Sequence, residues 1–125
     1  YYLPAPLVLS SSKERNNLQN LSIYRVVETL SLEADVSFVS LSPLLNDSPF
    51  RREGSIDREE LKMLKEKGAC GEILEQVFDE KGVLIQSAFN ERLAGVRIKS
   101  PTKRLIIGIS GGPAKYRPLL AAMRG

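Results

Sequence analysis

The sequence contains no histidine and only one cysteine, Cys70. Without histidine, the chain cannot supply a catalytic triad with an imidazole base, the usual zinc ligands, or acid and base chemistry by histidine. A single cysteine cannot form an internal disulfide. Because Cys70 lies between Ala69 and Gly71 in a segment expected to pack, we interpret it as a buried thiol and not as a nucleophile. No catalytic residue, metal or cofactor is predicted.

Long apolar runs and a secretion signal are also missing. No apolar run approaches the roughly 20 residues that cross a bilayer, and the first residues do not show a charged segment followed by an apolar run and a cleavage site. Together with the single cysteine, this favours a cytoplasmic protein without a membrane partner.

What is present fits one globular domain. The 125 residues are 42% hydrophobic and 26% charged, with a net charge of +3. These values are typical of a folded domain with one core. The basic residues are scattered among acidic ones, so direct binding to nucleic acid is not predicted.

The most informative stretch is an apolar run that ends in two glycines. Leu105–Ile109 predicts a buried strand, Gly111 and Gly112 a tight turn, and the segment from Tyr116 to Met123 a helix. Such a turn opens at the carboxyl end of the strand, where α/β sheets bind ligands, and Lys115 adds a positive charge there. The alternative is that the glycines only let the chain turn and that Lys115 is solvated.

Other elements follow from periodicity and capping residues. Apolar residues spaced three and four apart after Ser22 predict an amphipathic helix that lies on a sheet. Asp57, with Glu60 three residues later, predicts a helix start and Gly68 its end. The expected strands are Tyr1 to Leu3, Val36 to Leu41 and Leu105 to Ile109. The expected helices are Lys13 to Asn20, Ser22 to Leu32, Asp57 to Lys67 and Tyr116 to Met123. Residues 71–78 are expected to be extended, and a turn at 79–82 is expected to lead to an antiparallel segment, 83–86.

Four segments, in this order, carry a resemblance to a known family. They are Tyr2 to Leu7, Gly71-Glu72-Ile73, Asn90 to Val96, and Gly111-Gly112-Pro113-Ala114-Lys115 with the Leu-Leu-Ala-Ala-Met-Arg-Gly that follows. They resemble the sugar-binding domain of bacterial SorC/DeoR-type transcriptional regulators, and the resemblance covers nearly the whole chain.

The resemblance implies a three-layer α/β/α fold with a mainly parallel sheet, similar to the NagB/RpiA/CoA-transferase fold. It also implies that residues 1–125 are a partial sugar-binding effector domain, with an incomplete sheet at both ends. The family's DNA-binding domain would lie outside this chain.

The resemblance also suggests binding residues beside Gly111, Gly112 and Lys115. Glu72, expected at the start of a strand, matches an acid that accepts hydrogen bonds from sugar hydroxyls, and its alternative is an exposed strand residue. Arg51 or Arg52, in a long loop from Leu44 to Ile56, matches a basic residue that faces the ligand phosphate, with a solvated charge pair as the alternative.

Other positions in the resembling segments are assigned differently. Arg92 is expected to be structural and to pair with Asp79 or Glu91, and the alternative is that it supports the site. Gln86 stands where the family often has Asp, and Ser40 and Ser42 stand where Gly is more usual, so that their side chains would narrow the pocket.

Two functions follow. The first is a non-catalytic effector domain that binds a phosphorylated sugar and, in a homo-oligomer, controls DNA binding through a separate domain. The alternative is a sugar-phosphate isomerase or deaminase-like enzyme with Glu72 as a general base, since the family resembles that enzyme fold.

Overall fold

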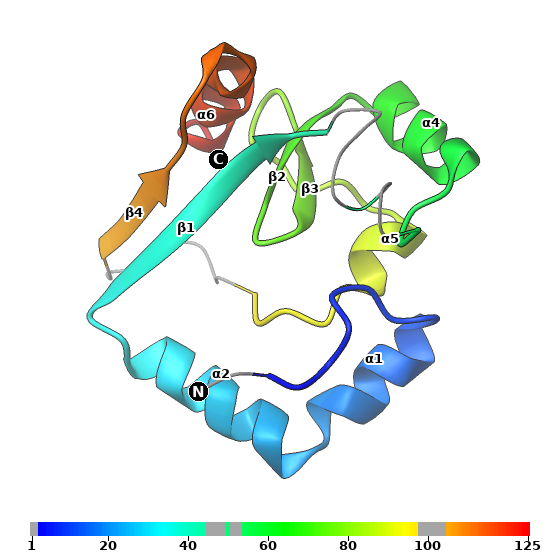
Figure 1. The fold of residues 1–125 in the computed structure, drawn as a ribbon, viewed down its shortest axis with the longest axis vertical. Coiled ribbons are helices and arrows are strands. Elements are labelled where there is room, and N and C mark those ends of the chain that lie inside the picture. The colour runs from blue at the N-terminus through cyan, green and yellow to red at the C-terminus, as the bar shows by residue number, and fades with distance from the viewer. Residues whose placement is uncertain (1–2, 45–49, 51–53, 98–104) are drawn as a thin grey trace.

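Four strands form a single mixed sheet in the order β3-β2-β1-β4 (Figure 1). The computed structural model describes residues 3–44, 50, 54–97 and 105–125. β1 and β4 are parallel, whereas β2 is antiparallel to both of its neighbours, β1 and β3. The strands are β1 (Val36–Pro43), β2 (Ala69–Ile73), β3 (Gln76–Asp79) and β4 (Leu105–Ile109).

The parallel pair brings together two segments that are far apart in the sequence. Val36 lies opposite Leu105, and Ser40 lies opposite Ile109. The prediction that these two apolar segments share one sheet is therefore confirmed. Tyr1 and Tyr2, from the third predicted strand, lie outside the described residues, and Leu3 is not part of a strand.

Capping side chains mark the starts of helices α1, α4 and α5, whereas α2 begins after Leu21 without a side-chain cap. The Ser11 hydroxyl accepts a hydrogen bond from the Glu14 N–H at the start of α1, and the Asp57 carboxylate accepts one from the Glu60 N–H at the start of α4. Gly68, with a φ of 86°, follows the end of α4 in a conformation that favours glycine. The helices are α1 (Ser12–Gln19), α2 (Ser22–Glu33), α4 (Arg58–Glu66), α5 (Ala88–Glu91), the 3-10 turn η1 (Pro113–Lys115) and α6 (Tyr116–Ala122).

The two faces of the sheet pack against different clusters of apolar side chains. Neighbouring side chains of a strand point to opposite faces, and in β3 Val77 belongs to one cluster and Phe78 to the other. α6 covers the Phe78 face (Figure 1). The Phe78 cluster contains Val39, Leu41, Phe78 and Ala121, and the Val77 cluster contains Leu44, Phe50, Ile56, Leu61, Leu64, Val77, Ile85, Phe89 and Leu93.

The prediction of one extended segment over residues 71–78 is wrong. The chain reverses at Leu74 and Glu75, whose φ angles of 47° and 69° are both positive, as a type I′ hairpin turn requires. Neither residue is the glycine or asparagine that usually marks such a turn, so the sequence gives no local signal. The predicted turn at 79–82 does form, because the Gly82 N–H donates to the Asp79 carbonyl. The segment after it runs antiparallel to β3 over a short bridge between Phe78 and Leu84, with backbone bonds from Asp79 to Val83 and from Ile85 to Val77.

Helix α2 forms as predicted but does not lie on the sheet. Among its residues only Tyr24 is buried, and its main contact is with α1 (Figure 1). The apolar side chains that were expected to face the sheet, Ile23, Val26 and Leu30, are exposed. An amphipathic pattern shows that a helix has an apolar face, but it does not show which element covers that face.

β4 is apolar on both faces and is nevertheless exposed. Leu105 is 58% exposed and Ile109 is 60% exposed, and on the neighbouring strand Phe38 is 67% exposed. The expectation of a buried strand is therefore wrong for the described residues, where β4 has β1 as its neighbour on one side and is the last strand in the sheet order.

No helix in the described ranges has both the length and the apolar character to cross a membrane.

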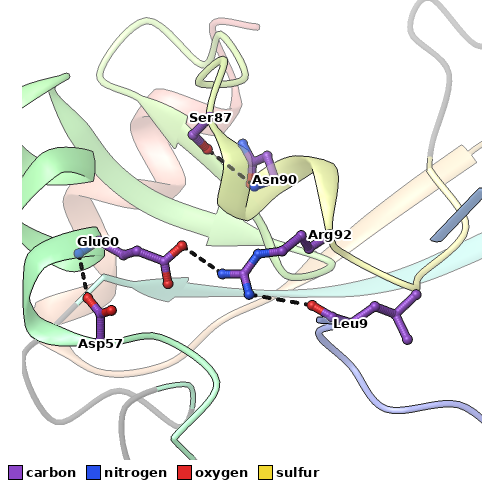
Figure 2. A network of polar contacts seen from close by, with 6 residues as sticks. All are labelled: Leu9, Asp57, Glu60, Ser87, Asn90 and Arg92. Carbon is purple, nitrogen blue, oxygen red and sulfur yellow. Dashed lines mark hydrogen bonds and ion pairs between the residues drawn. The ribbon is translucent and has the colours of Figure 1, made fainter. Parts of the chain in front are cut away.

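Arg92 holds three segments together, as Figure 2 shows. Its guanidinium forms an ion pair with Glu60 of α4 at 2.7 Å, donates to the Leu9 carbonyl at 3.4 Å, and lies 6.0 Å from the centre of the Phe89 ring. The expected structural role is thus what the structure shows. The expected partners were wrong, because Glu60 becomes a neighbour only through tertiary packing.

Asn90 of α5 lies beside Ser87, the N-cap of this helix (Figure 2). Its side-chain amide bonds to the backbone of β3 as a neighbouring strand would. Its side-chain oxygen accepts from the Val77 N–H at 2.9 Å, and its side-chain NH₂ donates to the carbonyls of Val77 and Ile85, both at 2.8 Å. Asn90 is only 6% exposed. Its amide therefore satisfies two buried backbone groups that would otherwise be costly to bury, the Val77 N–H and the Ile85 carbonyl. It is a second donor to the Val77 carbonyl, which also accepts from the Ile85 N–H at 3.0 Å.

Candidate functional site

The candidate site lies at the carboxyl ends of β1 and β4. Because the two strands are parallel, the segments that follow them meet at the same edge of the sheet. The Ser110 hydroxyl, directly after β4, donates to the Leu41 carbonyl of β1 at 3.3 Å. This bond ties the start of the glycine turn to the end of β1.

The glycine turn has the predicted position, and a 3-10 turn comes before the helix. Gly112 has a φ of 96°, a conformation that side chains rarely adopt, and Gly111 has open space where a side chain would begin. Pro113 starts η1, the Lys115 N–H donates to the Gly112 carbonyl at 3.1 Å, and α6 begins only at Tyr116. Both glycines are exposed, and Lys115 is half-buried.

Glu72 lies near the end of β2, opposite Ser42 of β1, and not at a strand start. Its Oε2 accepts a hydrogen bond from the Glu75 N–H at 2.9 Å, and the hydroxyl of Ser42, directly across the strand pair, lowers the pKa of its carboxyl as a hydrogen-bond donor. The left-handed turn at Leu74 and Glu75 returns the Glu75 amide toward this carboxylate. The carboxylate is therefore held by two neighbours on different segments.

Gly71 explains how β2 comes so close to its surroundings just before Glu72. A Cβ at this position would lie 2.7 Å from the Cβ of Pro118 in α6 and 2.8 Å from the Ser42 carbonyl oxygen. Any side chain would push β2 away from both. The glycine thus lets β2 lie close to β1 and α6, and this places Glu72 beside Ser42.

The surroundings of Glu72 act on its charge in opposite directions. Burial raises the pKa of Glu72, and this effect outweighs the hydrogen bonds from Glu75 and Ser42 and the positive charge of Lys115, which all lower it. Lys115, the predicted cation, thus acts through its charge on Glu72, the predicted acid. A half-buried carboxylate and an ammonium group form a site with an acceptor end and a cationic end.

The raised pKa of Glu72 predicts a pH-dependent gain on substitution. Because the pKa is higher in the folded than in the unfolded chain, ionised Glu72 lowers stability at neutral pH, and this cost disappears as the pH falls through the folded-state pKa. We expect Glu72→Gln to raise Tm at pH 7 and to have a smaller effect at pH 4. Thermal unfolding between these pH values tests this.

Glu33→Gln, at an exposed position at the end of α2, is the matched control and should show no such trend. A lower Tm of Glu72→Gln at neutral pH would contradict the assignment of a net burial cost to Glu72.

Other predicted positions are not all brought to this edge. Arg51 and Arg52 lie outside the described residues, although their neighbour Phe50 is buried in the core. Gln86 is exposed, and its carbonyl accepts from the Lys67 ammonium at 2.7 Å, next to the end of α4. Ser40 is exposed on β1 beside Ile109.

Cys70 is half-buried and packs against the cluster that contains Phe78. Burial is the largest cause that raises the pKa of its thiol, and the charge of Glu80 acts in the same direction. A raised pKa favours the protonated, unreactive thiol, in agreement with the packing interpretation.

Sequence reasoning missed the contact between Ser42 and Glu72 and the bond from Ser110 to β1. Both depend on strand register, which the sequence does not show directly. The serines at two strand ends were the only available signal.

Comparison with known proteins gives the family and the fold. Residues 1–125 match the family model described as "Putative sugar-binding domain". The deoxyribonucleoside regulator of Bacillus subtilis (strain 168) is 29% identical over 126 residues, which cover 99% of this chain and 40% of that protein. The chain thus spans about two fifths of the length of this relative.

Solved structures of regulators have the same fold. A DeoR family transcriptional regulator from Listeria monocytogenes superposes with a TM-score of 0.86 at 23% identity, covering 99% of this chain and 51% of the other. The full-length sorbitol operon regulator SorC from Klebsiella pneumoniae gives a TM-score of 0.81 at 23% identity over 96% of this chain and 39% of the other. The predicted α/β fold class is confirmed. Because the family model matches it from the first residue to the last, this chain belongs to the sugar-binding domain family of SorC/DeoR-type transcriptional regulators.

Proposed function

We propose that this chain is the effector-binding part of a transcriptional regulator and that it binds a phosphorylated sugar at the carboxyl ends of β1 and β4. The observation that carries the proposal is the meeting of the glycine turn with the end of β1 at this edge, where Ser110 is bonded to Leu41 and Glu72 lies opposite Ser42. A sugar phosphate needs both a cation for its phosphate and hydrogen-bond acceptors for its hydroxyl groups. The site offers one group of each kind.

The two ends of the ligand would bind to different segments. The phosphate would lie against the exposed turn at Gly111 and Gly112, where no side chain blocks the backbone, and would pair with Lys115. The hydroxyl groups would donate to Glu72. Arg51 or Arg52 would add a second positive charge to the phosphate end.

The proposal extends to the whole regulator. Its DNA-binding domain would lie in a part of the longer protein outside residues 1–125, and the intact protein would be a cytoplasmic homo-oligomer that reads two half-sites in DNA. The ligand would control DNA binding only by the difference between its affinities for two states of that oligomer. The names of the relatives, which are regulators, support this non-catalytic role.

We also propose that residues 1–125 form part of a larger sugar-binding domain. Parallel strands that are apolar on both faces are usually interior strands, and β4 is such a strand although Leu105 and Ile109 are exposed. On the α6 face, a mainly apolar hollow of about 600 Å³ lies between β1, β4 and the end of α6. Further strands and helices of the regulator would bury these surfaces.

Titration of the intact regulator with sugar phosphates tests the proposed function. Fructose 6-phosphate, glucose 6-phosphate, ribose 5-phosphate and inorganic phosphate would be compared by calorimetry, and the ligand would then be recovered and identified by mass spectrometry. We expect at least one sugar phosphate to bind more tightly than phosphate and to be recovered unchanged. Conversion of the ligand would instead support the enzyme alternative.

The variant Glu72→Ala tests the acceptor end of the site. It should reduce the preference for one sugar over another more than it reduces the affinity for inorganic phosphate, because the carboxylate is expected to contact hydroxyl groups. Glu33→Ala is the control. If Glu72→Ala leaves sugar preference unchanged, the hydroxyl end of the site lies elsewhere.

A further inference from the structure

Ser42 is the residue of β1 that faces Glu72 across the sheet. The two residues are opposite each other in the antiparallel pair of β1 and β2, and the Ser42 hydroxyl lowers the pKa of the Glu72 carboxyl as a hydrogen-bond donor would. In such a pair, side chains that are directly opposite point to the same face and are close enough to interact. The contact therefore follows from the register of the sheet.

The direction of this hydrogen bond is fixed by chemistry. An ionised carboxylate only accepts, so the single proton of the Ser42 hydroxyl must be donated to Glu72. The hydroxyl oxygen then retains only its lone pairs toward any other group. Its donor capacity is used up inside the protein.

A second donor limits the orientation of the Glu72 carboxylate. The Glu75 N–H donates to Glu72 Oε2 at 2.9 Å, from a turn in which Leu74 and Glu75 both have positive φ. Donors from two segments thus hold one side chain in one orientation. Because Glu72 and Ser42 are directly opposite each other, the acceptor positions that remain on them face the same side of the sheet.

We propose that Ser42 is a positioning and specificity residue, which holds the Glu72 carboxylate and forms with it a surface that only accepts hydrogen bonds. This inference rests on the proposed function. Such a surface selects ligand hydroxyl groups, which donate, and disfavours phosphate oxygens, which accept and are negative. The phosphate is thereby directed to the end of the site at Lys115, so the ligand binds in one orientation.

Two substitutions of Ser42 in the intact regulator test this inference. Ser42→Ala removes the hydroxyl, and Ser42→Thr keeps it on a side chain that is well suited to a strand. The probes are fructose 6-phosphate, glucose 6-phosphate, ribose 5-phosphate and inorganic phosphate. Ser37→Ala is the control, since Ser37 lies near the other end of β1, opposite Ile106.

We expect Ser42→Ala to weaken the tightest-binding sugar phosphate by about tenfold, the effect of one hydrogen bond to a charged group. In the same titrations, the affinity for inorganic phosphate should change by less than about twofold. Ser42→Thr should restore most of the sugar affinity, and Ser37→Ala should bind like the unchanged protein. A merely structural role of Ser42 would not separate sugar from phosphate in this way.

Two results would overturn the inference and leave the proposed function in place. One is unchanged sugar affinity in Ser42→Ala while Glu72→Ala loses sugar preference. The other is an equal loss for sugar phosphate and inorganic phosphate in Ser42→Ala that Ser42→Thr does not restore. If no sugar phosphate binds the unchanged protein, the proposed function fails first and this inference falls with it.

Discussion

Replacing Asn90 by alanine is expected to lower the free energy of unfolding by about 3 to 5 kcal/mol. The substitution removes three buried hydrogen bonds at once and leaves the Val77 N–H and the Ile85 carbonyl without the partner that Asn90 provides, whereas the Val77 carbonyl still accepts from the Ile85 N–H. Each such group costs about 1 to 3 kcal/mol when it is buried unsatisfied, and water that enters the vacated space offsets part of this cost. Urea unfolding of the intact protein measures the difference.

Asn90→Asp separates hydrogen bonding from packing. Aspartate has nearly the same shape but lacks the two N–H donors, and it would place a carboxylate against two carbonyl oxygens. We expect it to destabilise the protein at least as much as alanine at neutral pH. Asn16→Ala, at an exposed position in α1, is the control and should have little effect. Wild-type stability of Asn90→Asp would show that the side chain acts by volume alone.

Replacing Lys115 by alanine should weaken the binding of a sugar phosphate by about 1.5 to 3 kcal/mol, or roughly ten- to 150-fold. The reason is the loss of a charge-assisted contact with the phosphate at a half-buried position. The fold should remain intact, because the Lys115 side chain does not belong to either apolar cluster. Calorimetry with sugar phosphate and circular dichroism of the same sample test both statements.

The control for Lys115 is a lysine of the same charge away from the site. Lys62 of α4 has a side chain that is 78% exposed and forms only a long surface ion pair with Glu66, at 3.8 Å. Lys62→Ala should therefore not change ligand affinity beyond a small effect of net charge. Equal losses in the two variants would indicate that Lys115 acts through long-range attraction and not through contact with the phosphate.

The sequence was sufficient where local chemistry determines structure. The caps at Ser11 and Asp57 and the φ of Gly68 and Gly112 were all predictable from residue type. The apolar strands β1 and β4 could also be paired, because a strand-turn-helix pattern favours a parallel sheet. These features place the glycine turn and Lys115 correctly.

The features that local sequence did not reveal depend on tertiary contacts. Leu74 and Glu75 adopt left-handed conformations that neither residue prefers, and the packing of the hairpin between two apolar clusters stabilises the turn. The partner of Arg92 is Glu60, 32 positions away. The prediction that α2 lies on the sheet was wrong, because an apolar helix face does not specify the element that packs against it.

The separation of β1 and β4 along the chain has a consequence for the order in which the site forms. The hairpin of β2 and β3 joins neighbouring residues, so it can form early in folding, and it carries Glu72. The pairing of Val36 with Leu105 requires closure of a long loop and is expected late. A ligand that bridges Glu72 and Lys115 would then stabilise contacts that are absent from the folding transition state, so it should slow unfolding and leave the rate of folding nearly unchanged.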